Sequence, residues 1–374
     1  CLTFQQDAQP FCVDANVVRQ AAIQKAEVVS ATYEPREVRF RYPHFVQFVQ
    51  AQVERLFGSG EMFRRGFIIK TTLNPTIQDT AENALRTQIA ALTTTGVNTG
   101  SVMVTDPRTG AIRAMVGSPD FNNEAIGGQV NGSLTWQQPG SAIKPILYTG
   151  ALEGSDRNGD GILDFMTPAT VLWDVPTTFA NTNPPYTPTN FDGQFWGPLA
   201  VRYALQNSRN VPAVKTMEFI GAAKFQDVAT RMGLNFLPEA QFGLATALGA
   251  NEVTLYDMMV AFGTLANNGI RTSLYTIDSI TDANGQPILL AERTPPAQVV
   301  QPPIAFLMNN ILSDDNARAQ EFGLNGPLTI RGLSTSNVVA AKTGTTNQNR
   351  DLWTMGFTRN AVTGVWLGRA DNNP

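Results

Sequence analysis

Apolar residues recur along this chain with two different spacings, and these spacings predict where helices and strands form. A weak stripe predicts a helix in residues 12–29, and Asn74 is placed to cap another, with Pro75 at its first position. In residues 42–57 the repeat is clearer. There, the three- to four-residue spacing of one buried helix face is occupied by Phe45, Val46, Phe48, Val49, Val53 and Leu56.

Short runs rich in β-branched and aromatic residues predict strands towards both ends of the chain. Residues 64–73 form one run, 101–118 form a hairpin, and three more runs lie at 338–346, 351–359 and 361–368. Helical patterns predominate between residues 138 and 270, apart from a Pro- and Thr-rich stretch at 167–198. We therefore predict an α+β (mixed) fold, an antiparallel sheet flanked by helices, with a helical lobe inserted between its strands.

The charge balance argues against nucleic acid as a partner. The 374 residues include 27 Lys and Arg against 31 Asp and Glu, a formal net charge of −4, and no basic run. The same balance gives no support for binding to an anionic membrane surface. No window approaches 18 consecutive apolar residues, so we expect no membrane-spanning segment in this sequence.

The sequence starts at Cys1 without an initiator methionine or a signal peptide, and we expect it to be a piece of a longer protein. Its two cysteines, Cys1 and Cys12, both lie at this end. They either form a disulfide, which would suit an oxidising compartment, or remain unpaired in a frayed terminus. The sequence leaves both interpretations open.

The first candidate for chemistry is the segment from Ser141 to Lys144. A helix that begins here places residues i and i+3 on one face, so the Lys144 amine would lie near the Ser141 hydroxyl. Burial and the positive N-terminal end of the helix both favour the neutral amine, which could accept the serine proton. Taken alone, however, the pattern favours an ordinary capped helix whose lysine faces solvent.

A second candidate is Ser208-Arg209-Asn210, in a predicted loop between helices. The hydroxyl of Ser208 could relay a proton between Lys144 and a leaving group, and the Asn210 amide could hold a substrate amide. The alternative is an ordinary turn or helix cap, which Ser and Asn both favour.

A third candidate lies at the end of the apolar run 338–341. Lys342, Thr343 and Thr345 offer a cation and two hydroxyls to a carboxylate, and Gly344 allows a substrate backbone to approach closely. The backbone N–H of Thr345 could join that of Ser141 in an oxyanion hole. The alternative is a polar strand end.

Together and in this order, the three segments match the S-x-x-K, S-x-N and K-T-G set of penicillin-binding proteins and serine β-lactamases. The chain resembles the transpeptidase domain of class A, bifunctional penicillin-binding proteins. Beyond the motifs, the resemblance extends to the segments 42–49, 67–78, 101–118, 246–269, 311–323 and 351–368. It implies a penicillin-binding transpeptidase domain over residues 63–374 and a connector region over residues 1–62.

The resemblance implies a penicillin-sensitive DD-transpeptidase that needs no cofactor for catalysis. Ser141 would attack the penultimate D-Ala carbonyl of a peptidoglycan stem peptide, and an amine of a neighbouring stem would resolve the acyl-enzyme. Lys144 would be the base, Ser208 the proton relay and Asn210 a substrate holder. The segment Lys342, Thr343, Gly344 and Thr345 would bind the terminal carboxylate and shape the oxyanion site.

Class A proteins also carry a membrane anchor, a glycosyltransferase domain and a further helix beyond the position of Asn373, none of which is in this sequence. The resemblance thus implies a membrane-anchored parent protein that works at the extracytoplasmic face of a bacterial plasma membrane. It also predicts that one apolar face of the sheet is partly uncovered here.

Residues 156–167 have the pattern of an EF-hand calcium loop. Positions 1, 3, 5 and 9 of the loop are Asp156, Asn158, Asp160 and Asp164, and Gly161 stands at position 6, where the loop turns sharply. Ile162 would offer its carbonyl from position 7. Thr167 stands at position 12, where a bidentate glutamate is expected. A structural calcium site and a solvated Asp- and Gly-rich turn therefore both remain open.

Two other functions compete with transpeptidation. A β-lactamase or DD-carboxypeptidase on the same scaffold would hydrolyse the acyl-enzyme, and a class A β-lactamase needs a glutamate to activate water. Glu153 and Glu218 are present, but the sequence does not place them. A non-catalytic β-lactam sensor would be acylated and stop there. A Ser-Lys esterase is a more remote alternative.

Overall fold

The chain is described by a computed structural model, which covers residues 13–30, 40–60, 64–157, 159–180, 182–288, 290, 293–330, 339–346 and 349–371. It divides into two compact units, residues 1–41 and 42–374. The first unit contains helix α1 (Ala15–Ser30), in agreement with the predicted helix. Cys1 and Cys12 lie outside the described residues, so their pairing remains a prediction.

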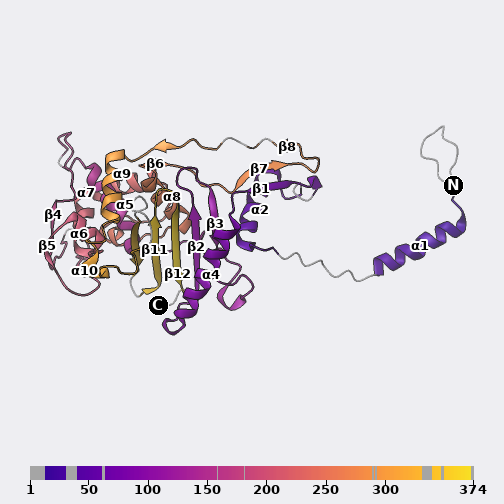
Figure 1. Cartoon of the computed structure of the whole chain (residues 1–374), viewed down its shortest axis with the longest axis horizontal. Helices are drawn as coiled ribbons and strands as arrows, with labels where there is room; N and C mark the ends of the chain where they lie inside the picture. The colour runs from indigo at the N-terminus through magenta and orange to yellow at the C-terminus, as the bar shows by residue number, and fades with distance from the viewer. Residues whose placement is uncertain are drawn as a thin grey trace. The chain divides into compact units, whose positions relative to one another are not determined.

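The second unit is built around a five-stranded antiparallel sheet with the strand order β10-β11-β12-β2-β3 (Figure 1). Two strands come from the early part of the chain and three from its end: β2 (Thr99–Thr105), β3 (Ile112–Val116), β10 (Ala340–Thr345), β11 (Asp351–Phe357) and β12 (Val362–Gly368). Strand β12 joins the two parts, with Val365 opposite Val102 on β2. The predicted α+β fold, with a sheet assembled from distant parts of the chain, is confirmed.

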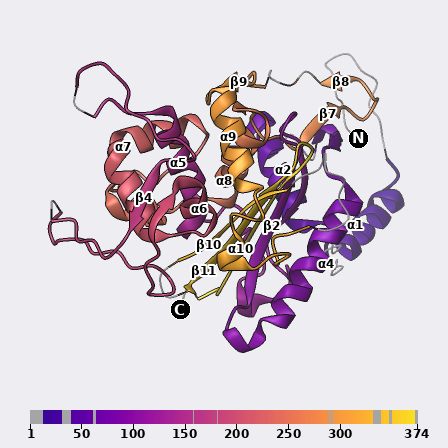
Figure 2. The ribbon, with the colours of Figure 1, turned by 60° about the vertical axis from the view of Figure 1, so that its left-hand side comes forward.

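Alternating side chains give the sheet two buried faces. On β2, Met103 belongs to the large core on one face and Val102 to a smaller cluster on the other. Helix α8 (Leu255–Ala266) packs on the first face and α4 (Pro75–Ala91) on the second (Figure 2). Asn74 caps α4 as predicted, accepting a hydrogen bond from the Ile77 N–H at 3.2 Å.

The large core continues into a helical lobe beside the β10 edge of the sheet. At its centre lies α5 (Lys144–Glu153), which is buried from Lys144 to Leu152 and packs against α7 and α9. Around α5 are arranged the short helices η3 (Gly140–Ile143) and η4 (Leu244–Leu248), with α6 (Val201–Gln206), α7 (Asn210–Arg231), α9 (Pro302–Leu312) and α10 (Ala319–Phe322). Two hairpin-like pairs complete it: β4 (Val171–Asp174) with β5 (Gly197–Ala200), and β6 (Ile270–Arg271) with β9 (Ala297–Gln298).

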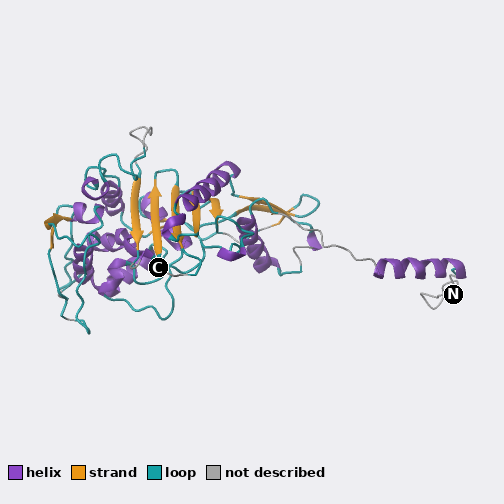
Figure 3. Cartoon of the chain, turned by 90° about the horizontal axis from the view of Figure 1, so that it is seen from below, coloured by secondary structure: helices purple, strands orange, loops and turns teal. Residues whose placement is uncertain are grey.

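The strand predicted in residues 64–73 does form, but in a separate sheet. Strand β1 (Ile68–Thr71) pairs with β7 (Ile277–Thr281), which pairs with β8 (Pro287–Ile288) (Figure 3). Helix α2 (Pro43–Phe57) follows its predicted periodicity and buries Phe45, Val49 and Val53 in the large core. Because α2 packs there, the second compact unit starts at residue 42, whereas the predicted boundary lies at 62.

An apolar groove of about 470 Å³ lies between α4 and the sheet. Its lining includes Ile77, Leu85, Val102, Val365 and Leu367. Part of this face is therefore an apolar groove beside α4, and the uncovered face that the resemblance implies remains a prediction. Of the helices that the structure describes, none combines the length and apolar composition that a membrane crossing requires.

Candidate active site

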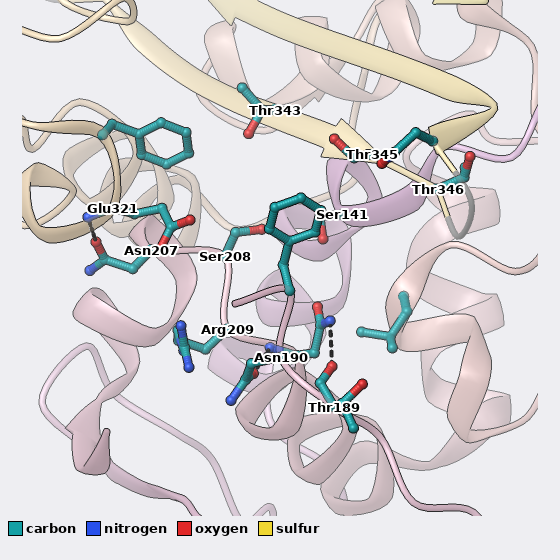
Figure 4. Close-up of a pocket in the computed structure, with 15 residues that line it drawn as sticks. Ser141, Thr189, Asn190, Asn207, Ser208, Arg209, Glu321, Thr343, Thr345 and Thr346 are labelled. Carbon is teal, nitrogen blue, oxygen red and sulfur yellow. Dashed lines mark hydrogen bonds between the residues drawn. The ribbon is translucent and has the colours of Figure 1, made fainter. Parts of the chain in front are cut away.

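The three predicted motifs meet at one cleft of about 460 Å³ between the β10 edge of the sheet and the helical lobe. Ser141, Ser208, Asn210, Thr343 and Thr345 all line it. In Figure 4, Ser141 lies between the Thr345 end of β10 and the turn that carries Ser208. The structure thus brings together residues that are separated by up to 204 positions in the sequence.

Ser141 lies one turn before α5, in the 3₁₀ helix η3, and Lys144 is the first residue of α5. The sequence predicts one continuous helix here. In a 3₁₀ turn, side chains at i and i+3 eclipse each other, so the tighter helix keeps Ser141 and Lys144 on one face. Within the described part of the chain the Ser141 hydroxyl makes no hydrogen bond, and it faces the cleft.

Lys144 is fully buried and turns its amine towards the Ser208–Asn210 turn. Its Nζ lies 2.6 Å from the Ser208 carbonyl oxygen, 2.8 Å from Asn210 Oδ1 and 3.2 Å from the Arg209 carbonyl oxygen. All three partners are oxygen acceptors, so the Lys144 amine is the donor in each contact. The solvent-facing lysine that the short pattern favoured on its own is therefore wrong.

Burial holds the pKa of Lys144 well below the usual lysine value. The positive charges of Lys342 and Arg209 act in the same direction, and the negative charge of Asp174 acts against them. An uncharged lysine amine at neutral pH can accept a proton, which is the property that a serine nucleophile requires of its neighbour.

Ser208 links the two buried lysines. Its carbonyl accepts from Lys144, and its hydroxyl accepts a hydrogen bond of 2.8 Å from Lys342 Nζ. To do both, Ser208 adopts a left-handed conformation with φ of 56°, which is uncommon for a residue with a side chain. Ser208 and Arg209 lie in the turn between α6 and α7, and Asn210 is the first residue of α7. The residue with the uncommon conformation is thus the one that contacts both amines.

Lys342 is 2% exposed, and burial lowers its pKa to about 7, with Glu321 acting in the opposite direction. Its Nζ also donates to the Thr343 carbonyl oxygen at 2.7 Å. Glu321 lines the same cleft, and its backbone N–H donates to Asn207 Oδ1 (Figure 4). Neither Glu321 nor Asn207 belongs to the three short motifs, so the sequence alone does not single out either residue.

Gly344 lies close to the backbone of the Ser141 turn, whereas the sequence analysis expects it to lie close to a substrate backbone. A Cβ atom at this position would lie 2.3 Å from the Pro139 carbonyl oxygen and 2.8 Å from the Ala142 nitrogen. Gly140, with φ of 52°, faces the same strand, since its Cβ would lie 2.5 Å from the Thr345 carbonyl oxygen. Glycine is thus required where β10 packs against the Ser141 turn, whereas the sequence argument related it to substrate.

The Asp156–Asp164 loop is closed at its base by two backbone hydrogen bonds between Ser155 and Asp164. The Asp156 carboxylate accepts hydrogen bonds from the backbone N–H groups of Gly159, Asp160 and Gly161. Among the described residues, no group of three or more acidic, His or Cys side chains is arranged to hold a metal. Asn158 lies outside those residues, and calcium binding here remains a prediction.

The sequence profile of the penicillin-binding protein transpeptidase domain matches residues 100–364. Penicillin-binding protein 1A of Neisseria lactamica is 33% identical over 281 residues, which are 72% of this chain and 32% of that protein. Penicillin-binding protein 1B of Haemophilus influenzae is 30% identical over 344 residues, 90% of this chain and 41% of that protein. The chain belongs to the penicillin-binding protein transpeptidase family, and it spans about a third of the length of the first of these relatives.

Solved structures share the fold. Penicillin-binding protein 1A from Haemophilus influenzae superposes with a TM-score of 0.74 at 19% identity, over 94% of this chain and 69% of that chain. The PonA1 protein from Mycobacterium tuberculosis, in complex with penicillin V, superposes with a TM-score of 0.70 at 22% identity, over 89% of this chain and 86% of that one. These likenesses support the architecture described above.

Proposed function

We propose that this chain is a serine DD-transpeptidase, which cross-links peptidoglycan stem peptides through an acyl-enzyme on Ser141 and is inhibited by β-lactams that acylate the same residue. The observation that carries the proposal is the convergence of three motifs at one cleft, with a buried amine of lowered pKa three residues after the candidate nucleophile. Membership of the penicillin-binding protein transpeptidase family supports it.

In the first half-reaction the Ser141 hydroxyl gives its proton to Lys144, and the oxygen attacks the carbonyl carbon of the penultimate D-Ala. When the tetrahedral intermediate breaks down, the C–N bond to the terminal D-Ala is cleaved. The leaving nitrogen then takes a proton from Lys144, through the Ser208 hydroxyl. The backbone N–H groups of Ser141 and Thr345 would stabilise the oxyanion, and the close packing of β10 on the Ser141 turn supports this pairing.

In the second half-reaction an acceptor amine attacks the ester carbon and Lys144 removes a proton from it. The Ser141 oxygen leaves, is reprotonated, and a new amide bond joins the two stems. Lys342, Thr343 and Thr345 would hold the terminal carboxylate of the donor. Asn210 has one Nδ2 hydrogen engaged with the Thr189 carbonyl at 2.8 Å, so the other is available for a substrate carbonyl.

The hydrolytic alternative is less well supported by the two glutamates considered from the sequence. Glu153 forms ion pairs with Lys224 and Arg231, at 2.9 and 2.8 Å. Glu218 lines a different groove, next to Lys215 and Phe219. Among the described residues that line the cleft, Glu321 is the one carboxylate, so a water-activating base would have to be Glu321.

Benzylpenicillin tests the nucleophile directly. We expect intact-mass measurement to show one adduct on the wild-type chain and none on Ser141→Ala. An adduct on both proteins, or on neither, would refute the assignment of Ser141.

The reaction class needs a second assay, with a stem-peptide donor and an amine acceptor. We expect a cross-linked product. Rapid turnover of nitrocefin would favour the hydrolase, and a stable adduct without any cross-linked product would favour the sensor.

Two further parts of the proposal come from the relatives. We propose that the parent protein is anchored in the bacterial plasma membrane, carries a glycosyltransferase domain and presents this chain at the extracytoplasmic face. No cofactor is needed for the steps above. Calcium bound at Asp156, Asp160, Asp164 and the Ile162 carbonyl, with Asn158, would be structural, and an unchanged melting temperature on adding calcium would contradict it.

A further inference from the structure

Behind the Ser208–Asn210 turn lies a buried ion pair that is outside the recognised chemistry of the three motifs. Arg209 Nε lies 3.0 Å from Asp174 Oδ2, and the two side chains are 3% and 0% exposed. Charges buried to this degree are costly to desolvate, unless hydrogen bonds satisfy their remaining polar atoms. The other contacts of the pair therefore indicate what it holds in place.

Every remaining contact of the Arg209 guanidinium goes to one segment, the excursion between β4 and β5. Nη1 lies 2.9 Å from Asp192 Oδ2, and Nη2 donates to the Gln194 carbonyl. The guanidinium carbon lies 4.1 Å from the centre of the Trp196 ring. This segment, residues 175–196, lies within the Pro- and Thr-rich stretch 167–198, for which the sequence analysis predicts no role.

Asn190, in the same segment, connects the ion pair to the start of α7. Its Nδ2 donates to Asp174 Oδ1 at 2.7 Å and to the Gln194 carbonyl at 2.8 Å. Its Oδ1 accepts from the backbone N–H groups of Asn210 and Val211, at 2.7 and 3.3 Å. The N-cap residue of α7 makes no side-chain cap of its own, so Asn190 supplies the cap from elsewhere in the chain.

These contacts reach the reacting groups in two steps. The capped residue, Asn210, accepts from Lys144 Nζ through Oδ1 and donates to the Thr189 carbonyl, next to Asn190. The preceding residues, Ser208 and Arg209, offer their carbonyls to the same amine. A shift of Asn190 or Asp174 would therefore move three of the acceptors that orient Lys144.

We infer that Asp174, Asn190 and Arg209 form a buried clamp that positions Ser208, Asn210 and the Lys144 amine for acyl transfer. This inference rests on the proposed function. Asn190 and Arg209 also border the cleft, but their polar side-chain atoms are engaged with the clamp and its neighbours, so we treat the three as positioning residues.

The clamp also sets the charge around Lys144. The charged groups facing this amine are Lys342 from β10, Arg209 from the turn before α7 and Asp174 from β4. Behind them, Asp192 pairs with Arg209, and Glu321 faces Lys342. Arg209 lowers the pKa of Lys144 and Asp174 raises it, so the two ends of one ion pair act on the amine with opposite signs.

Because Arg209 and Asp174 change the pKa of Lys144 in opposite directions, variants of the two should shift the pH dependence in opposite directions. Residues with a purely structural role would not produce this result. The second-order rate of acylation by benzylpenicillin should be measured across pH by intact mass, because the acidic limb reports the protonation of Lys144. Arg209→Gln removes a positive charge, so we expect the limb to move to higher pH. Asp174→Asn removes a negative charge, so we expect it to move to lower pH. Each shift should be roughly one pH unit, and the double variant should lie near the wild type.

Asn190→Ala tests the geometric part. We expect acylation to slow by about tenfold to a hundredfold, the loss in rate that corresponds to one or two buried hydrogen bonds, while the pH limb stays in place. Glu153→Gln is the matched control. It breaks ion pairs to Lys224 and Arg231 in the same lobe, so it should lower the melting temperature without changing the acylation rate or its pH dependence.

The outcomes separate this inference from the proposed function. Suppose that the wild type is acylated, that Asn190→Ala reacts normally, and that Arg209→Gln and Asp174→Asn shift the acidic limb in the same direction or not at all. The clamp is then wrong, while the proposed function is still supported. If Asp174→Asn does not fold, Arg209→Gln and the double variant carry the charge test. A wild type that forms no adduct refutes the proposed function, and the clamp falls with it.

Discussion

At the scale of single residues, the site depends on two lysines held in places where lysine is costly. Lys144 and Lys342 are among the largest fully buried side chains of the protein, and each has few charged neighbours of opposite sign. Removing an ammonium group from water disfavours its charged form, so each amine is driven towards neutrality. The same burial that prepares the amines for proton transfer therefore lowers the stability of the folded chain.

The pH dependence of stability should reveal this cost. The pKa of Lys342 is about 7 in the folded chain and about 10.5 when unfolded, so below pH 7 the full cost of the buried charge is present. Between pH 7 and 10.5 Lys342 is neutral in the folded chain but still protonated in the unfolded chain. The free-energy cost to folding therefore falls as pH rises, and it is gone above pH 10.5. We expect Lys342→Met to raise the melting temperature at pH 6 by roughly 5 °C, with the difference shrinking towards pH 10.

Differential scanning calorimetry at several pH values checks this expectation. Lys70→Met is the control, since Lys70 is exposed on β1 and its loss should change little at any pH. A Lys342→Met protein that is less stable than the wild type at pH 6, or equally stable at all pH values, would contradict the account. The loss of the hydrogen bonds to Ser208 and Thr343 works against the effect, and we expect the buried charge to outweigh it.

At the scale of elements, the geometry of the site comes from one close contact between a strand and a turn. Strand β10 passes so near the Ser141 turn that Gly344 and Gly140 have no space for a Cβ. Gly249 approaches from η4 in the same way, since its Cβ would lie 2.3 Å from the Gly140 carbonyl oxygen. Backbone atoms, which cannot rotate out of the way, fix the position of the Ser141 turn from both sides.

Gly344→Ala should therefore disturb catalysis more than an alanine in a strand normally would. The added methyl group would meet backbone atoms of Pro139 and Ala142, so the turn must shift by a substantial fraction of an ångström. We expect acylation by benzylpenicillin to fall by about a hundredfold, the usual effect of a displacement of that order. Stopped-flow or intact-mass kinetics would measure it.

Gly356→Ala provides the comparison for this variant. It lies on the neighbouring strand β11, and its Cβ would meet nothing closer than 3.7 Å. We expect normal acylation from it. Equal rates for the two variants would show that the packing of β10 on the Ser141 turn does not determine the position of the nucleophile.

The elements also show how far the sequence leads. Periodicity and turn residues locate α2, α4, the β2–β3 hairpin and the C-terminal strands, because each follows from local spacing. The partners of these elements do not follow from spacing: β1 pairs with β7, about 200 residues later, in a sheet of its own. The three motifs identify the reacting groups, but Asp174, Asn190 and Glu321 reach the site by tertiary folding and carry no local signal.

At the scale of the whole molecule, all the described site residues belong to the unit that begins at residue 42. Among the described residues, the large core of that unit runs from α2 to β12. The first unit contains helix α1, which is exposed over residues 15–29.

A chain that starts at Tyr42 should therefore keep its chemistry. We expect residues 42–374 to be acylated by fluorescent penicillin at the same rate as the longer chain, within about twofold, because no core residue is lost. Circular dichroism and the melting temperature verify folding. A folded truncated chain that reacts more than tenfold more slowly would mean that residues 1–41 contribute to the site.

The pairing of β12 with β2 has a consequence for the time at which reactivity appears. A ribosome completes the serine of this site about two hundred residues before it completes Lys342, and the strand beside Val102 is made later still. An interrupted or prematurely ended polypeptide would have the nucleophile without the strand that shapes its surroundings. The cleft can therefore form only after β12 has been made, and pairing between such distant segments is typically a slow step in folding.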